Sequence, residues 1–130
     1  SAVPPATLVE ALAGAGLDFF GGIFPGLIHG GGVHKRGALV YKFPVLRRPV
    51  MIRGLAAMGY DLAQLNGVAA RVKRRKHTVL VLVDGMAMNI SVLLEEMFNR
   101  FGDRLHYFGG GAGVNILSAD KSILHGGIAA

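Results

Sequence analysis

The fold of this chain is decided by the stretch Thr78-Val79-Leu80-Val81-Leu82-Val83, which Asp84-Gly85 follows directly. Its apolar residues run on without alternating with polar ones, as is typical of a strand that is buried on both faces. Strands of this kind belong to parallel sheets that helices cover on both sides. Asp-Gly ends the run because both residues favour turns. We therefore expect this strand to lie at the centre of an α/β sheet.

Further elements are predicted downstream of this strand. They are an amphipathic helix over Asn89–Phe101, a strand over Leu105–Phe108 that leads into the glycine run Gly109–Gly113, and a last strand over Ser122–Ala129. The apolar side chains that this helix is expected to turn inward are Ile90, Leu93, Leu94, Met97 and Phe101.

Upstream of the central strand the pattern is less regular. A helix is expected to begin after Pro4-Pro5 and to end at Gly14 and Gly16. The remaining expected elements are strands over Leu17–Gly22, Gly37–Phe43 and Val50–Leu55, and a loop over Phe24–Gly32. Asp61–Lys76 is ambiguous, because its apolar side chains recur at helical spacing but Asn66-Gly67 interrupts them.

The fold class is therefore α/β, with a mixed or mainly parallel sheet and covering helices. The length of 130 residues fits a single domain over residues 1–130. An order of helix, strand, glycine loop and strand occurs twice, once between Leu8 and Val40 and once between Leu93 and Ala129. Either a duplicated unit or a chance agreement between glycine-rich segments explains this order.

Composition narrows the class of protein. Hydrophobic residues make up 52% of the chain and charged residues 17%, which excludes overall disorder. The absence of cysteine excludes disulfide bonds, thiolate metal ligands and cysteine nucleophiles. Polar residues interrupt the longest apolar stretch, Thr78–Leu94, which is shorter than the roughly 20 residues of a membrane-spanning helix. We therefore expect no membrane partner. Ser1–Pro5 carries no charged leader and no methionine, so we expect a piece of a longer protein.

Two glycine motifs match known motifs in letters but not in context. Gly109–Gly113 is followed by neither a helix pattern nor Gly-Lys-Ser/Thr, which excludes a dinucleotide fingerprint and a P-loop. It is either a turn or close backbone approach that needs glycine, or a loop around a non-nucleotide ligand. His29-Gly30-Gly31-Gly32 matches the oxyanion-hole motif of esterases, but no serine of the chain lies in a Gly-x-Ser-x-Gly elbow. We therefore expect no catalytic residue.

No metal and no cofactor are expected either. His29 and His34 have the right chemistry for a metal ligand, but two histidines in a glycine loop form no closed coordination set. The other histidines are dispersed along the chain and are expected to be solvated or satisfied within the core.

A ligand site is predicted where the central strand ends. In open α/β sheets, ligands bind outside the carboxyl ends of strands. The predicted site consists of Asp84, Gly85, Gly109, Gly110, Gly111, Ala112 and Gly113, with Gly21, Gly22 and His29 as a second rim. Glycine lets backbone N–H groups approach a ligand, and the Asp84 carboxylate accepts a hydrogen bond from an ammonium, which together suit an amino acid. The alternative is that these residues only form turns.

The basic run Arg71-Val72-Lys73-Arg74-Arg75-Lys76 contributes much of the formal charge of +6. It lacks interleaved aromatic residues and any recognisable reading module for nucleic acid. A solvated linker or helix end is therefore favoured, and we expect no nucleic-acid partner.

Three stretches resemble the FIST sensory domain, in particular its N-terminal module. They are Asp18–Gly26 (DFFGGIFPG), Thr78–Met86 (TVLVLVDGM) and Tyr107–Gly113 (YFGGGAG), and together they span nearly the whole chain. The resemblance implies a non-catalytic, cytoplasmic domain that senses a small-molecule ligand, with amino acids as candidates, and couples to a signalling partner protein. A small-molecule hydrolase and a basic nucleic-acid-binding module are the alternatives.

The chain departs from the family in length. It is shorter than a full N-terminal module, and we expect it to lack the opening strand and the C-terminal partner module. A sheet without its edge strand exposes unpaired backbone N–H and C=O groups, which pair with another chain. A homo-oligomer is therefore expected.

Overall fold

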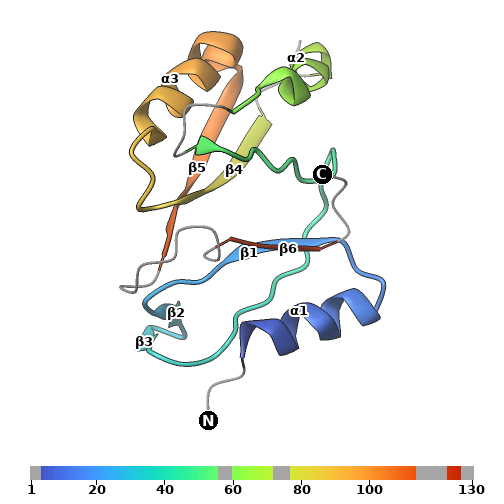
Figure 1. Ribbon diagram of the computed structural model, residues 1–130, viewed down its shortest axis with the longest axis vertical. Helices are drawn as coiled ribbons and strands as arrows, with labels where there is room; N and C mark the ends of the chain where they lie inside the picture. The colour runs from blue at the N-terminus through green and yellow to red at the C-terminus, as the bar shows by residue number, and fades with distance from the viewer. Residues whose placement is uncertain (1–3, 56–59, 72–76, 114–122, 127–130) are drawn as a thin grey trace. The chain divides into compact units, whose positions relative to one another are not determined.

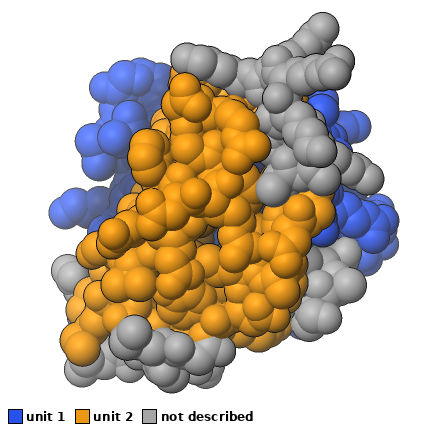
Figure 2. Space-filling model, turned by 90° about the horizontal axis from the view of Figure 1, so that it is seen from above, with its two compact units in different colours: residues 1–49, 112–130 blue, residues 50–111 orange. Residues whose placement is uncertain are grey.

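The computed structural model describes residues 4–55, 60–71, 77–113 and 123–126 (Figure 1). The elements in chain order are helix α1 (Pro5–Gly14), strands β1 (Phe19–Gly22), β2 (Leu27–His29) and β3 (Gly32–His34), the 3-10 helix η2 (Ala63–Leu65), helix α2 (Asn66–Arg71), strand β4 (His77–Asp84), helix α3 (Ile90–Phe101), the 3-10 helix η3 (Gly102–Arg104), and strands β5 (Leu105–Ala112) and β6 (Ile123–Gly126). The chain divides into two compact units, coloured in Figure 2: unit 1 is residues 1–49 and 112–130, and unit 2 is residues 50–111.

The fold is mixed α/β, which confirms the predicted fold class. Strands β4 and β5 pair in parallel, and α3 connects them, because parallel neighbours need a crossover segment. The other strands form antiparallel pairs, β1 with β6 and β2 with β3. The prediction of a single domain is not tested by this division into units and stays a prediction.

Unit 2 is built around the apolar face of α3. Leu93, Met97 and Phe101 recur every four residues, so they lie on one face of the helix, and all three are buried. The buried residues that complete this core are Leu62, Leu65 and Leu105. The prediction that Leu94 also points inward is wrong, because a residue one step beyond Leu93 is turned about 100° around the helix axis, and Leu94 is 40% exposed.

The C-terminal end of α3 is closed by side-chain and backbone features. Gly102 takes a positive φ of 59°, which a residue without a Cβ adopts at no steric cost. The Arg104 side chain donates to the carbonyl oxygens of Arg100 and Phe101, both at 2.9 Å. These carbonyls lack partners within the helix, so Arg104 satisfies them and fixes the connection to β5.

Unit 1 contains a hairpin where a loop was predicted. Gly30 and Gly31 take φ values of 58° and 77°, the conformation that a two-residue type I′ turn requires at both central positions. The turn pairs His29 with Gly32, and β2 pairs with β3 on either side of it. The predicted loop over Phe24–Gly32 is therefore wrong in part, because its glycines close a hairpin.

Two predicted strands are absent. Gly37–Phe43 and Val50–Leu55 form neither helix nor ladder, apart from a 3-10 residue at Leu55. β-propensity depends on a neighbouring strand to pair with, and no described strand pairs with either segment. The suggested duplication therefore lacks the second strand of its first copy. In the ambiguous stretch 61–76, η2 and α2 form, and α2 begins at Asn66 itself.

Candidate functional site

Unit 2 holds a surface hollow of about 420 Å³ at the carboxyl ends of β4 and β5. The residues that line it are Val81, Val83, Gly85, Ile90, Leu94, Tyr107, Phe108, Gly109, Gly110 and Gly111. We call this hollow the β4–β5 pocket. Parallel strands bring their carboxyl ends to the same edge of a sheet, and this edge is where open α/β folds bind ligands. The predicted meeting of Gly85 with Gly109, Gly110 and Gly111 is therefore found.

The glycines of β5 bring its backbone against β4. A Cβ at Gly109 would lie 1.8 Å from the carbonyl oxygen of Val81, and a Cβ at Gly111 would lie 2.9 Å from the Cα of Gly85. A Cβ at Gly110, in contrast, would meet no atom within 4 Å. The interpretation as a close backbone approach is confirmed for Gly109 and Gly111, and the interpretation as a turn is wrong for Gly109–Gly111, which lie inside β5.

Asp84 forms the turn that leaves β4. Its Oδ1 accepts a hydrogen bond from the N–H of Met86 at 3.0 Å, and its carbonyl oxygen accepts one from the N–H of Ala87 at 3.0 Å. This is an Asx turn, the structural role that Asp-Gly favours. Asp84 itself does not line the β4–β5 pocket, whereas the next residue, Gly85, does. Its part in ligand binding stays a prediction.

The remaining glycines of the predicted site belong to unit 1, where Gly22 packs tightly and Gly113 forms a backbone hydrogen bond. A Cβ at Gly22 would lie 2.6 Å from the Cβ of Ala112, which is itself buried. The N–H of Gly113 donates to the carbonyl oxygen of Ile23 at 2.8 Å, so this donor is already used. These residues have a packing role, and their role in a ligand site stays a prediction. A Cβ at Gly21, in contrast, would meet no atom within 4 Å. The role of Gly21 in a ligand site also stays a prediction.

The esterase-like motif serves the β2–β3 hairpin. Its glycines form the type I′ turn described above, and the His29 carbonyl oxygen lies 3.2 Å from Nε2 of His34. Both histidines are exposed. The same letters that form an oxyanion hole in a hydrolase therefore make a turn here, because Gly-Gly provides the two positive φ values that the turn needs.

Sequence reasoning missed the apolar walls of the β4–β5 pocket. Ile90 and Leu94 stand one turn apart on α3, beside its buried face, and Phe108 is 69% exposed on β5. The Ile90–Leu94 spacing is visible in the sequence, but the same spacing predicts residues of the core. Only the packing of α3 on β4 and β5 shows which of its apolar residues line the pocket and which belong to the core.

Tyr107 contributes its ring to the pocket and its hydroxyl to the helix. The hydroxyl donates towards the carbonyl oxygens of Met97 at 3.3 Å and Gly102 at 3.5 Å. Burial raises the pKa of the Tyr107 phenol above its ordinary 10.0, although the Arg104 guanidinium opposes this. The Phe98 ring lies beside it, with 6.2 Å between the ring centroids. Tyr107 therefore ties the pocket wall to the end of α3.

The described residues contain no group of three or more His, Cys, Asp or Glu side chains that could hold a metal ion. Of the basic run, Arg71 ends α2, and residues 72–76 lie outside the described part of the chain. Of the last strand predicted over Ser122–Ala129, residues 123–126 form β6, and residue 122 and residues 127–129 lie outside the described part. None of the helices in the described ranges is long and apolar enough to cross a membrane.

Fold and site together define a small α/β module whose pocket is lined by apolar side chains and by glycine backbone. The family model of the FIST N domain matches residues 2–130, so the chain belongs to the FIST N domain family. This confirms the resemblance seen in the sequence. FIST domains are a sensory and non-enzymatic family, which is consistent with a role in signalling. No curated protein and no solved structure gives a significant match to the chain.

Proposed function

We propose that this chain is a non-catalytic sensor that binds a small ligand, an amino acid with an apolar side chain, in the β4–β5 pocket. Binding there is coupled to a signalling partner protein. The observation that carries the proposal is the composition of the pocket wall. Val81, Val83, Leu94 and Phe108 supply apolar surface, while Gly85 and the β5 glycines leave backbone groups uncovered by side chains. Such a mixture of apolar walls and a few polar groups is typical of small-molecule sites.

Each part of an apolar amino acid has a counterpart in this pocket. The apolar side chain fits the valine, leucine and phenylalanine wall, because burial of apolar surface is favourable. The carboxylate fits backbone N–H donors near the glycines. The ammonium fits the carboxylate of Asp84, one residue before Gly85. A cytoplasmic location is part of the proposal and is compatible with the family's sensory role.

The proposal is tested first by narrowing the pocket. Leu94 lines the pocket and is 40% exposed, so Leu94→Trp fills space with little effect on the core. Val92 on the same helix is 37% exposed and does not line the pocket, which makes Val92→Trp the matched control. We expect apolar amino acids to raise the melting temperature of the unaltered chain and of Val92→Trp, but not of Leu94→Trp. If no standard amino acid shifts the melting temperature, or both tryptophan variants respond equally, the proposal fails.

A second test concerns the ammonium group. Asp84→Asn keeps an oxygen acceptor for the Asx turn and removes the charge. We expect the affinity for the amino acid to fall by about 1.5–3 kcal/mol, the range for a hydrogen bond to a charged group, while the chain stays folded. Calorimetric titration measures this loss. Unchanged affinity in the folded variant would remove Asp84 from the site but leave the pocket.

A further inference from the structure

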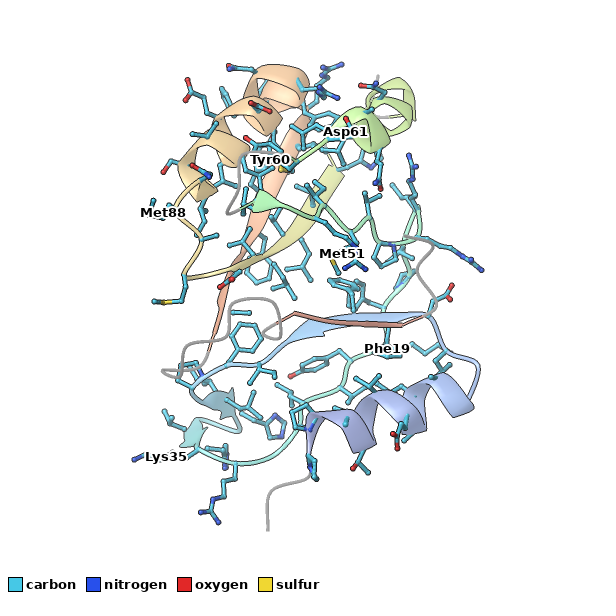
Figure 3. All side chains as sticks on the ribbon, in the orientation of Figure 1. Phe19, Lys35, Met51, Tyr60, Asp61 and Met88 are labelled. Atoms are coloured by element: carbon cyan, nitrogen blue, oxygen red, sulfur yellow. The ribbon has the colours of Figure 1, made fainter. Side chains whose placement is uncertain are left out.

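Residues 35–48 form a continuous basic and apolar surface on unit 1, which we call the docking segment. Its sequence, KRGALVYKFPVLRR, holds five basic residues and no acidic one. All of its residues are exposed, and it forms neither helix nor strand. Its large apolar side chains are between 38% and 77% exposed, and they are Leu39, Val40, Tyr41, Phe43, Val45 and Leu46. Figure 3 shows Lys35, at one end of the segment, extending away from the ribbon.

The docking segment is nevertheless held in place at two points. The Phe43 ring meets the ring of Phe20 edge-on, with 6.4 Å between centroids and 84° between planes. Nε of Arg48 lies 3.0 Å from Oδ2 of Asp18, just before β1. A segment fixed at two points loses less conformational entropy when a partner binds than a free one does.

Its polar groups are largely without partners inside the described chain. Arg48 is paired with Asp18, but Lys35, Arg36, Lys42 and Arg47 form no ion pair with any described residue. Among the described residues, no backbone hydrogen bond outside the helices and strands involves residues 35–48. With respect to the described residues, the segment thus combines unpaired backbone donors and acceptors, apart from Pro44, which has no N–H, with positive charge and apolar side chains.

We propose that the docking segment adds as a strand to the sheet edge of a partner protein whose exposed strand carries acidic and apolar side chains. Strand addition uses the free backbone groups of both segments for affinity and their side chains for specificity. The lysine and arginine side chains select acidic neighbours, since like charges placed opposite each other cost stability. Because the segment carries five basic residues and no acidic one, the same rule disfavours pairing with its equivalent in a second copy of this chain.

The observations disfavour two other occupants. A membrane surface would bring backbone groups without partners towards hydrocarbon, where each costs several kcal/mol. Single-stranded nucleic acid binds through bases that stack on aromatic rings, but most of the exposed apolar side chains of the segment are aliphatic. An acidic protein strand satisfies the backbone, the charge and the apolar side chains at once.

This inference names the partner chemistry of the signalling role proposed above, and it rests on that role. Its test does not use the β4–β5 pocket, so the two proposals can fail separately. A chain that binds amino acids but no acidic strand keeps its sensory pocket and loses this docking surface.

The test uses the whole chain and a labelled peptide of about ten residues, the upper end of the usual range of strand lengths, with alternating valine and glutamate. A second peptide replaces each glutamate with lysine. We expect fluorescence anisotropy to show binding of the acidic peptide only. Binding should weaken between about 50 and about 300 mM salt, because ions screen exposed charge pairs.

Charge reversal locates the binding surface. Lys42→Glu with Arg47→Glu is expected to weaken binding of the acidic peptide by about tenfold or more, since each reversal removes one attraction and adds a repulsion. Val40→Ser with Leu46→Ser tests the apolar contribution in the same way. The matched control is Arg74→Glu with Arg75→Glu, which changes the net charge equally but outside the docking segment. Circular dichroism checks that every variant is folded.

Each of the following results would overturn the proposal. The first is no binding of the acidic peptide by the folded chain. The second is an equal loss of peptide affinity in the Arg74→Glu with Arg75→Glu control, which would mean that binding depends only on net charge. The third is tighter binding, through Lys42 and Arg47, of phosphatidylserine vesicles or of an oligothymidylate. The fourth is self-association that the same charge reversals abolish.

Discussion

The two units differ in how much apolar surface each buries within itself. In unit 2, six apolar residues of η2, α3, β5 and the preceding chain form a buried cluster around Phe101. In unit 1, Ala112 is the one buried residue among those described, and α1 buries none. Many large apolar side chains of unit 1, Leu46 and Ile28 among them, are instead more than half exposed. Burial of apolar area is the main favourable term in folding, so we expect unit 2 to contribute more to the free energy of unfolding than unit 1.

Removing a large aromatic side chain from each unit tests this difference most directly. Phe101→Ala empties the centre of the unit 2 core, where Phe101 is 1% exposed, and we expect a loss of about 3–5 kcal/mol of unfolding free energy. Phe43→Ala in unit 1 removes a half-exposed ring and one aromatic contact, so we expect a loss of about 1 kcal/mol or less. Urea unfolding measures both. Equal losses would mean that the two units do not differ in burial.

Strand glycines in the two units provide the next comparison. Gly109→Ala would place its methyl group on the Val81 carbonyl oxygen, and a backbone atom cannot rotate away. We expect a loss of about 3 kcal/mol, as in an overpacked core. Gly21→Ala in β1 meets open space, so the expected change is within about 0.5 kcal/mol. A Gly109→Ala variant with unaltered thermal stability would contradict the close approach of β5 to β4.

Polar contacts are expected to give smaller effects. Asp84→Ala in unit 2 removes the acceptor of the Met86 N–H, which costs about 1 kcal/mol. Arg48→Ala in unit 1 breaks an exposed ion pair with Asp18, for which about 0.5 kcal/mol or less is expected. Thermal melts compare the two, with Asp84→Asn as the control that preserves the turn. A greater loss of stability from Arg48→Ala than from Asp84→Ala would contradict the expectation that this polar contact matters more in unit 2 than in unit 1.

The smallest expected effect is a loss of stability of unit 2 at alkaline pH. The pKa of Tyr107 is raised by burial in the folded state, so the folded state holds this proton more tightly than the unfolded state. The resulting stabilisation is complete below pH 10.0, the ordinary value, and is lost as pH rises through the folded pKa. We expect Tyr107→Phe to flatten the fall in melting temperature above that pH. Tyr41→Phe, on the exposed docking segment, should leave the fall unchanged; the reverse pattern would contradict the assignment.

Elements whose pattern is local are predictable from the sequence. The apolar run of β4 predicts a strand, and the parallel pairing inferred from it is found, but burial on both faces is wrong because none of its residues is fully buried. The apolar spacing on α3 placed Leu93, Met97 and Phe101 in the core. Such features depend on side-chain period and on the residues that begin and end each element. They are therefore readable without knowledge of the neighbours.

Which segments pair, and which surfaces form a hollow, depends on how the elements pack together. Gly37–Phe43 has the composition of a strand, but a strand also needs a neighbour to receive its hydrogen bonds. Gly109–Gly111 has the composition of a turn, but it lies inside β5, where β4 is too close for a side chain at Gly109 or Gly111. Leu94 became a pocket wall rather than a core residue through the way α3 packs on the two strands. Each outcome depends on contacts between residues far apart in the chain, which the local pattern of residues does not contain.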